Sequence, residues 1–416
     1  MARLVLTCWG SHGDVDPFLG LGLALRRRGH RVAIVTLEYY RSLITGAGLD
    51  FFPLRPSPDP TETRLVERLM DPRRGTEFIL KELLFPALED MFDDVAAASA
   101  DADLIVSHPV TFATPLVAEH RRVPWASVVL APMSFFSACD MPVLPPAPWV
   151  KSFDLLGPWA GRAIVGLAKS VTARWERPVV EMRRRLGLPS TGQPVFEGQH
   201  SPRLVLAMFS RVLGAPQPDW PANVTITGHP FFDAPHGTSL EPELEAFLQR
   251  GDPPIVFTLG SSVVLVAKTF WRESLDAAAR LGRRAVLLAG PQTAPLLRAE
   301  LAASGRHDAV AFERAPHSQL FLQAAAVVQQ CGIGTLAQSL RSGRPFLAVP
   351  WAHDQPDNAF RAARLGVARI LAQHAYRGPR VARELDVLLT EPKYAAAARQ
   401  VADVVRAEPG IAGVCD

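Results

Sequence analysis

The sequence has few cysteines, an almost even charge balance and no long hydrophobic run, and each absence excludes a class of protein. Its four cysteines are too few and too far apart for the disulfide framework of a small secreted domain, which favours a reducing cytoplasm. The 44 Lys and Arg residues against 41 Asp and Glu leave a formal charge of +3, which is too small to favour nucleic acid as a partner.

Exported and membrane-spanning classes are also disfavoured. The N-terminus carries only the short apolar run Leu4-Val5-Leu6, which fits a strand better than a signal peptide. No stretch of about 18 apolar residues occurs, so we expect no transmembrane helix. The pI near 8.8 leaves a peripheral contact with a membrane surface open.

Short β-rich runs alternate with helical patterns along nearly the whole chain, which predicts parallel sheets covered on both faces. One series of strands begins at residues 4–7 and a second begins at 255–258, after a segment rich in proline and glycine. We therefore predict an α/β fold with two Rossmann-like doubly wound domains, residues 1–215 and 255–416, joined by a linker at 216–254. The carboxyl ends of the two sheets would face each other across a cleft.

The expected strands of the first series are residues 4–7, 31–36, 104–106, 127–130 and 204–206, and the linker holds a short strand at 224–227. Those of the second series are residues 255–258, 285–288, 310–312, 326–328 and 346–349.

A loop with Gly10, Gly13 and Pro17 directly follows the first expected strand and opens a helix. Loops at this end of a parallel sheet point into the ligand crevice, so Asp14 and His12 could act on a bound hydroxyl. Alternatively, Asp14 only caps the helix and His12 is a solvated loop residue. Neither sheet has a complete dinucleotide fingerprint, which disfavours an NAD-dependent enzyme.

A second turn, Gly332-Ile333-Gly334-Thr335, lies between the strand at 326–328 and a helix. Its free amide groups, the helix dipole and the Thr335 hydroxyl would suit a diphosphate. The same two glycines also occur at ordinary strand-to-helix turns.

A third block, from Gly343 to Ala359, contains Asp354 and Gln355 just beyond a strand end. A carboxylate and a carboxamide together can bind the vicinal hydroxyls of a sugar, or they can cap the next helix. A metal site at His353 and Asp354 is disfavoured because no second His stands at helical spacing.

Together these motifs resemble the nucleotide-sugar signature of the family 1 glycosyltransferases, inverting enzymes of the two-domain GT-B fold. The loop Gly-Ser-x-Gly-Asp-Val-x-Pro resembles a bacterial branch with sterol glucosyltransferases, antibiotic glycosyltransferases and the rhamnosyltransferase chain of rhamnolipid synthesis. Further similarity at 218–221, 227–233 and 257–261 extends the resemblance over nearly the whole chain.

The resemblance implies a role for each motif. Asp14 would be the base that deprotonates the acceptor hydroxyl, with His12 beside it. The donor-binding residues would be Ser261 or Ser262, Gly332, Gly334 and Thr335 at the diphosphate, Asp354 and Gln355 at the sugar, and Arg314 at the nucleobase.

Two departures from the family pattern stand out. Relatives carry one or two His before a Gly-Gly turn, whereas this chain has Gln329-Gln330-Cys331-Gly332. We favour Gln330 over Gln329 as the residue that contacts the diphosphate. Relatives also continue into a helix that returns to the first domain, whereas this chain stops at Asp416, which predicts a truncated C-terminus.

The resemblance implies that a hexose, glucose or rhamnose, moves from UDP-glucose, TDP-rhamnose or another NDP-sugar to a hydroxyl of an apolar natural product or lipid. No metal or other cofactor is expected. Phe135, Phe136, Met141 and Trp149 are candidates for the acceptor pocket, although their segment could also only cover the core. The competing hypothesis is a catalytically weak sugar-nucleotide-binding or auxiliary protein, because of the paired glutamines and the expected truncation.

Overall fold

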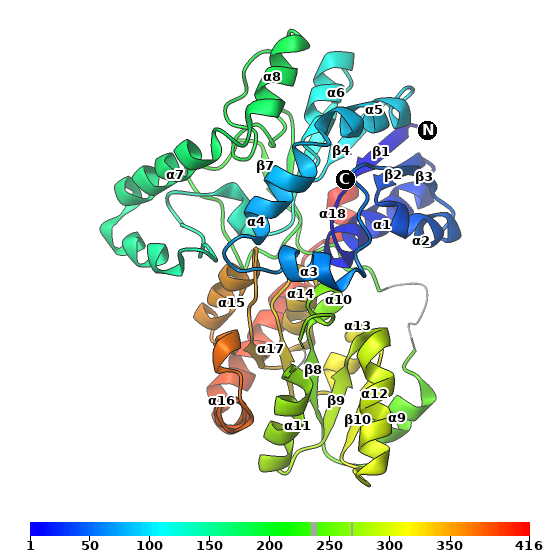
Figure 1. Ribbon diagram of the computed structural model, residues 1–416, viewed down its shortest axis with the longest axis vertical. Coiled ribbons are helices and arrows are strands. Elements are labelled where there is room, and N and C mark those ends of the chain that lie inside the picture. Colours follow the sequence, from blue (N-terminus) through cyan, green and yellow to red (C-terminus); the bar gives the residue numbers. More distant parts are fainter. Residues whose placement is uncertain (234–238, 268) are drawn as a thin grey trace. The chain divides into compact units, whose positions relative to one another are not determined.

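The computed structural model describes residues 1–233, 239–267 and 269–416, and its internal contacts divide the chain into two units. The N-terminal unit comprises Met1–Pro60, Arg73–Phe232 and Glu408–Asp416. The C-terminal unit comprises Thr61–Pro72 and the chain from Asp233 to Ala407. Each unit has its own parallel sheet flanked by helices (Figure 1).

The sheet of the N-terminal unit has seven strands among the described residues, in the order β3-β2-β1-β4-β5-β6-β7. Its five central strands are largely apolar and buried on both faces, as in parallel sheets that helices cover from both sides. The strand order reverses between β1 and β4, which places a ligand crevice at their carboxyl ends. The strands are β1 (Arg3–Thr7), β2 (Arg31–Thr36), β3 (Asp50–Pro53), β4 (Leu104–Ser107), β5 (Trp125–Val129), β6 (Val205–Ala207) and β7 (Val224–Ile226).

The α-helices of this unit lie between its strands along the chain, except α18, which follows the last strand. They are α1 (His12–Arg27), α2 (Arg41–Gly46), α4 (Gly75–Phe78), α5 (Leu88–Ala98), α6 (Ala113–Arg121), α7 (Pro158–Thr172), α8 (Arg177–Arg185) and α18 (Ile411–Cys415). Shorter or irregular turns are η1 (Glu38–Tyr40), η2 (Ile79–Leu84), η3 (Pro132–Phe135) and η4 (Pro148–Leu156). The proline-rich segment 132–158 is thus largely irregular, as its composition predicts.

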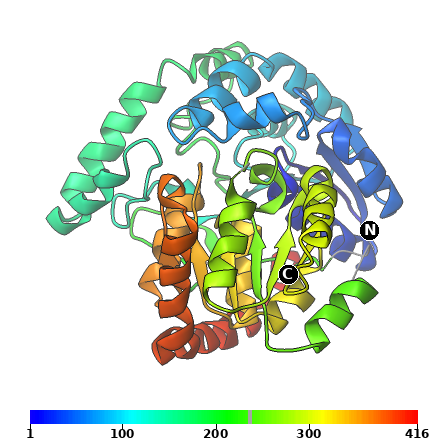
Figure 2. The same ribbon diagram turned by 60° about the horizontal axis from the view of Figure 1, so that its bottom comes forward.

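The described residues of the C-terminal unit form a six-stranded sheet in the order β10-β9-β8-β11-β12-β13, with helices on both sides (Figure 2). Here the order reverses between β8 and β11. The strands are β8 (Ile255–Thr258), β9 (Ala285–Leu288), β10 (Ala309–Phe312), β11 (Ala326–Gln329), β12 (Phe346–Ala348) and β13 (Ala368–Ile370). The helices are α3 (Thr63–Leu69), α9 (Pro242–Gln249), α10 (Gly260–Val263), α11 (Phe270–Arg280), α12 (Gly290–Ala303), α13 (His317–Leu320), η5 (Phe321–Gln323), α14 (Ile333–Ser342), α15 (Gln355–Arg364), η6 (Gln373–Ala375), α16 (Gly378–Thr390) and α17 (Pro392–Arg406).

The predicted fold class is confirmed, since both units are doubly wound parallel sheets. The bounds of the units differ from the predicted domains. The strand expected in the linker is β7, an edge strand of the N-terminal sheet, and α9 from the same linker belongs to the C-terminal unit. Residues 61–72 also join that unit, where Met70 packs against its core.

The expectation that the chain lacks a returning helix is wrong. Residues 408–416 belong to the N-terminal unit, and α18 packs on α1. The contact is close, because a Cβ placed at Gly20 would lie 2.9 Å from Ile411 Cδ1. Arg28 also forms an ion pair of 2.7 Å with Asp416.

Candidate active site

Asp14 lies in the first turn of α1 and takes part in its N-terminal cap. Its Oδ2 accepts a hydrogen bond of 2.8 Å from the Ser11 amide, while the Ser11 hydroxyl accepts one of 3.3 Å from the Gly13 amide. Gly10 has a φ of 141° and no room for a side chain, since a Cβ there would lie 2.2 Å from Asp14 Oδ2. The capping interpretation of Asp14 is therefore confirmed, and the side chain still keeps 33% of its surface exposed.

The histidine beside Asp14 is His108, at the end of β4, which the sequence analysis missed. Its Nε2 lies 3.4 Å from Asp14 Oδ1, and the side chain is only 6% exposed. Its Nδ1 accepts a hydrogen bond of 3.4 Å from the Val110 amide, so Nε2 is the ring nitrogen that can donate to Asp14. Both residues stand where the strand order of the N-terminal sheet reverses.

His12 turns to a different partner. Its Nδ1 lies 3.1 Å from Asp16 Oδ1, and its ring meets the edge of Tyr40 with centroids 5.1 Å apart. The structure therefore pairs His12 with Asp16 and brings His108, rather than His12, to Asp14.

The glycine turn of the C-terminal unit begins α14. Gly332 is its N-cap, and the amides of Ile333, Gly334 and Thr335 lie in the first turn, where a helix offers no acceptor of its own. Cys331 has a φ of 68°, a backbone conformation that favours glycine. The turn presents a row of donors and a helix dipole to any anion placed there.

The two glutamines before this turn lie in different surroundings. Gln329 is fully buried and donates a hydrogen bond of 2.8 Å to Ser339 Oγ on α14. The Gln330 side chain packs against Gly260 and Gly332, two glycines that follow strand ends. A Cβ atom added at Gly260 would lie 2.2 Å from Gln330 Nε2, and one added at Gly332 would lie 3.2 Å from the same atom. Its Oε1 is buried, with no hydrogen-bond partner among the described residues.

Asp354 and Gln355 follow β12, and a third residue, Asn358, connects them to the glycine turn. Asn358 Nδ2 donates to Asp354 Oδ2 at 2.7 Å and to the Cys331 carbonyl at 3.0 Å. Asp354 occupies the N-cap position of α15, but its side chain forms no capping hydrogen bond. Gln355 Oε1 accepts from the Trp351 amide at 2.9 Å, which leaves its Nε2 as the donor for other groups.

The remaining donor candidates also follow strand ends of the C-terminal sheet. Ser261 is exposed in α10 after β8, and Arg314 is exposed in the loop after β10. The side chain of Ser262 lies outside the described part of the structure. Because all these strands are parallel, the predicted donor residues gather at one edge of the sheet, around the reversal between β8 and β11.

The predicted acceptor residues lie in different surroundings. Met141 is buried in the core, Phe135 stacks on Trp220 with centroids 4.1 Å apart, Phe136 packs against Phe196, and Trp149 is exposed.

A cavity of about 470 Å³ lies instead between α6 and α8. Its lining includes Ser107, Pro109, Phe112, Leu116, Val179 and Gln199. Ser107 and Pro109 are the chain neighbours of His108. The C-terminal unit has a cavity of about 420 Å³ beside Trp351, and none of the predicted donor residues lines it.

Comparison with known proteins decides the family. The chain is 35% identical over 428 residues to the O-mycaminosyltylonolide 6-deoxyallosyltransferase of Streptomyces fradiae, and the match covers 99% of this chain and 96% of that protein. The chain belongs to the family 1 glycosyltransferases. No family model matches this glycosyltransferase.

Other relatives of this glycosyltransferase agree. It is 28% identical to the glycosyltransferase GtfE of Amycolatopsis orientalis, over 88% of this chain and 85% of that protein. It is 26% identical to a sterol 3-beta-glucosyltransferase of Arabidopsis thaliana, over 85% of this chain and 55% of that protein.

Solved structures agree on the GT-B fold of this glycosyltransferase. The glycosyltransferase of kitacinnamycin matches with a TM-score of 0.72 at 18% identity, over 100% of this chain and 97% of that one. A Streptomyces glycosyltransferase complexed with thymidine diphosphate matches with a TM-score of 0.63 at 20% identity, over 100% and 98%. Among the described residues, no helix combines the length and apolar character needed to cross a membrane.

Proposed function

We propose that the chain transfers a hexose, glucose or rhamnose, from an NDP-sugar to a hydroxyl of an apolar natural product or lipid, with inversion at the anomeric carbon. The observation that carries this proposal is the partly exposed Asp14 carboxylate beside His108 at the crevice of the N-terminal sheet. Relatives named for O-mycaminosyltylonolide and for sterols support an apolar acceptor. The four free cysteines fit a reaction in the cytoplasm.

In this mechanism Asp14 removes the proton from the acceptor hydroxyl as that oxygen attacks the anomeric carbon of the donor. The Ser11 amide and His108 hold the carboxylate from two sides, which fixes its orientation. A positioned base of this kind contributes about 10²- to 10⁴-fold to the rate. His12 serves no step in this mechanism, because it is paired with Asp16.

The departing diphosphate is proposed to lie at the start of α14. The amides of Ile333, Gly334 and Thr335, the Thr335 hydroxyl, Gln330 and Ser261 or Ser262 would donate to its oxygens. These donors and the helix dipole stabilise the leaving-group charge, so the proposed reaction does not call for a metal ion. The thymidine diphosphate complex of a structural neighbour supports a nucleoside diphosphate as the ligand.

Asp354 and the Gln355 Nε2 are proposed to bind the sugar hydroxyls, and the exposed Arg314 guanidinium to stack on the nucleobase. The apolar body of the acceptor is proposed to occupy the cavity between α6 and α8. Its 470 Å³ volume lies in the range of small-molecule pockets, and its wall includes both chain neighbours of His108.

The proposed function is tested by incubating the purified chain with UDP-glucose, TDP-glucose or TDP-rhamnose, with and without apolar hydroxyl compounds. We expect slow NDP release that an acceptor accelerates, and a product whose anomeric configuration, read by NMR, is opposite to that of the donor. Binding of NDP-sugars without any NDP release would instead identify the chain as a binding or auxiliary protein.

The first prediction separates the sugar from the diphosphate. Gln355→Ala removes the Nε2 donor, and the oxygen that accepts from the Trp351 amide, without adding a charge near the diphosphate. If that donor binds a sugar hydroxyl, affinity for the NDP-sugar should fall by about twofold to tenfold, the worth of one hydrogen bond, while affinity for NDP stays constant. Titration calorimetry with both ligands measures this, and equal losses for the two ligands would contradict a role confined to the sugar.

The second prediction restores the family residue beside the diphosphate. In Gln330→His, a phosphate oxygen would hold the imidazole protonated and accept a charge-assisted hydrogen bond in place of a neutral one. The gain should be about 1 kcal/mol, or several-fold in NDP affinity. Calorimetry with NDP measures it.

The matched control is Gln329→His. Gln329 is fully buried and bonded to Ser339, so this variant should lower thermal stability without raising NDP affinity. A gain from Gln329→His with none from Gln330→His would show that the assignment is one residue off.

A further inference from the structure

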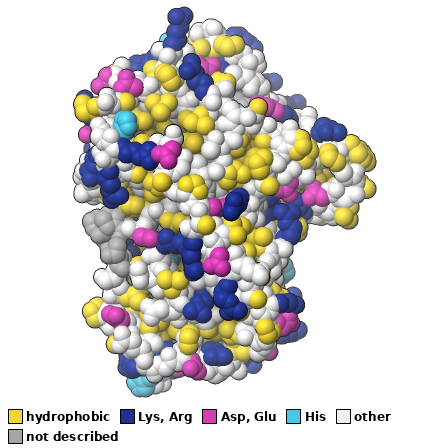
Figure 3. All heavy atoms as spheres, turned by 180° about the vertical axis from the view of Figure 1, so that it is seen from behind, with side chains coloured by type: hydrophobic (Ala, Val, Ile, Leu, Met, Phe, Trp, Pro, Cys, Tyr) yellow, Lys and Arg dark blue, Asp and Glu magenta, His cyan; other side chains and the backbone are white. Residues whose placement is uncertain are grey.

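Exposed apolar side chains concentrate on one short segment of the N-terminal unit. Of the thirteen large hydrophobic side chains that are strongly exposed among the described residues, six lie within residues 149–171. Leu155 is 91% exposed. They form the η4–α7 patch, which consists of Trp149, Leu155, Leu156, Trp159, Leu167 and Val171. In Figure 3 the region of α7 projects at the right, and hydrophobic side chains gather on it.

The packing of α7 explains why the apolar side chains of the η4–α7 patch are not covered by the rest of the unit. Ala160 and Gly161 are the buried residues of the helix, and a Cβ at Gly161 would lie 2.1 Å from the Ala138 carbonyl oxygen. The side of α7 that carries Gly161 therefore rests on backbone. Trp159, Leu167 and Val171 are exposed at other positions of the helix, spaced by multiples of four residues, and form an apolar stripe.

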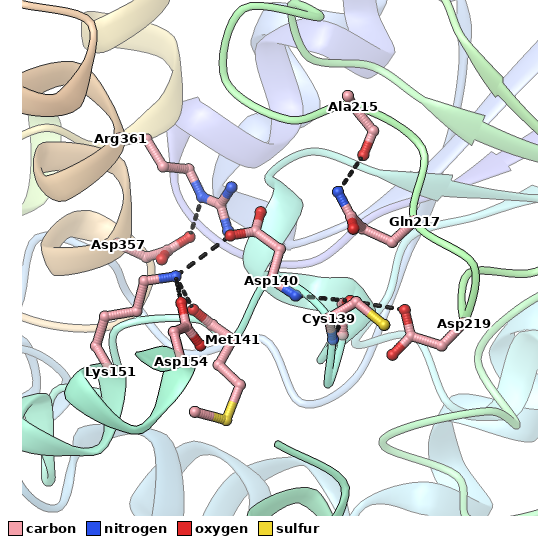
Figure 4. A network of polar contacts seen from close by, with 11 residues as sticks. Cys139, Asp140, Met141, Lys151, Asp154, Ala215, Gln217, Asp219, Asp357 and Arg361 are labelled. Atoms are coloured by element: carbon pink, nitrogen blue, oxygen red, sulfur yellow. Dashed lines mark hydrogen bonds and ion pairs between the residues drawn. The ribbon is translucent and has the colours of Figure 1, made fainter. Parts of the chain in front are cut away.

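The segment is anchored below this face by polar contacts. Lys151 Nζ lies 3.2 Å from Asp140 Oδ1, 2.6 Å from Asp154 Oδ2 and 2.5 Å from the Met141 carbonyl oxygen (Figure 4). Asp219 accepts hydrogen bonds from the Ser137 hydroxyl at 2.7 Å and the Ala138 amide at 2.6 Å. These contacts hold the loop under α7, and the apolar stripe takes no part in them.

Basic residues predominate around the patch, although Asp154 within it is 33% exposed and Glu197 beside Lys169 is 49% exposed. In the segment Leu155–Val180, Arg162, Arg174 and Arg177 are exposed, and Lys169 is paired with Glu197. The single carboxylate of that segment, Glu176, is buried, and burial raises its pKa. The exposed charged side chains of this segment itself are therefore basic.

We propose that the η4–α7 patch docks the protein on an anionic phospholipid bilayer, with α7 lying in the plane of the interface. An amphipathic helix with Trp and Leu on one face and Arg beside them has the composition of interfacial helices, and Trp favours the headgroup level. A second copy of the chain is a less suitable occupant of the η4–α7 patch. A two-fold interface would bring the arginines of both copies together, with no exposed carboxylate of the segment between them.

The proposal is tested by vesicle flotation of the full chain. The vesicles consist of phosphatidylcholine alone, or of phosphatidylcholine with about a third of phosphatidylglycerol. We expect binding to the anionic vesicles that weakens with salt, and weak binding to the neutral ones. Leu155→Gln combined with Leu167→Gln should reduce the bound fraction about tenfold at limiting lipid. The control is Leu296→Gln, which removes a leucine that is 70% exposed on α12, and it should bind like the parent.

The charges are tested separately by Arg162→Gln combined with Arg174→Gln. This variant should lose the preference for anionic vesicles, whereas Arg272→Gln, an exposed arginine on α11, should keep it. Sugar transfer to a water-dissolved acceptor should be unchanged in every variant, so failure of the docking proposal can be told from failure of the proposed function. No flotation of the parent, or equal flotation of the double leucine variant, would overturn the proposal. Light scattering that shows a dimer which the leucine variant abolishes would assign the patch to a second copy instead.

Discussion

Replacing Asp14 by Asn should lower the turnover of sugar transfer by about 10²- to 10⁴-fold while the protein stays folded. The asparagine oxygen can still accept from the Ser11 amide, so the cap of α1 is kept and only the basic group is lost. Affinity for the NDP-sugar should stay constant, because the residues proposed to bind it all belong to the C-terminal unit. Single-turnover kinetics and calorimetry with an NDP-sugar measure the two effects.

The matched control for this prediction is Asp16→Asn. Asp16 lies in the same helical turn, but its carboxylate pairs with His12 and not with His108. This variant should transfer sugar at nearly the parental rate. If instead Asp14→Asn keeps that rate and Asp16→Asn loses it, Asp14 is only a cap, and His12 with Asp16 becomes the better candidate for the base.

The fold could be predicted because its signals are local. Each central strand is a short apolar run followed by a helical pattern, and eleven of the thirteen described strands coincide at least in part with predicted ones. The two that were missed are edge strands with weak patterns, since β3 reads Asp-Phe-Phe-Pro and β13 reads Ala-Arg-Ile. The return of the chain end to the N-terminal unit could not be predicted, because it depends on contacts such as Glu408 with Ser210.

Candidate site residues could be singled out where they are contiguous in the sequence. The glycine turn, the Asp354-Gln355 pair and the loop of Asp14 were singled out by their positions after strand ends together with the family resemblance. His108, the partner of Asp14, was missed because it follows β4, which pairs with β1 although it lies about a hundred residues further along the chain. The order of the strands in a sheet cannot be deduced from the order of their residues in the sequence. Which of Gln329 and Gln330 faces the glycine turn could also be decided only from the structure, because successive residues of a strand point to opposite faces of the sheet.

His108 is held in place independently of Asp14, which makes it suited to orient the carboxylate. Its carbonyl oxygen accepts from the Thr111 hydroxyl at 2.8 Å and from the Thr111 amide at 3.0 Å. Thr111 in turn bonds to Thr7 on β1 at 3.1 Å, so the end of β4 is tied to the strand that precedes Asp14. The ring meets the edge of Phe18, with centroids 5.8 Å apart. We therefore expect His108 to act as a positioning residue for Asp14.

Replacing His108 by Phe should lower kcat by up to about 10²-fold, because a base that is misplaced by a fraction of an ångström loses its alignment with the acceptor hydroxyl. The phenyl ring fills the same space against Phe18, so the protein should stay folded, and NDP binding should not change. His108→Gln should recover part of the loss, since its amide N–H can still donate to Asp14 Oδ1. The control is His120→Phe, which changes an exposed histidine on α6 and should leave kcat at the parental value. A purely structural role would lower the melting temperature of both His108 variants together with kcat. Equal kcat values for His108→Phe and the parent would show that the Ser11 amide alone orients the base.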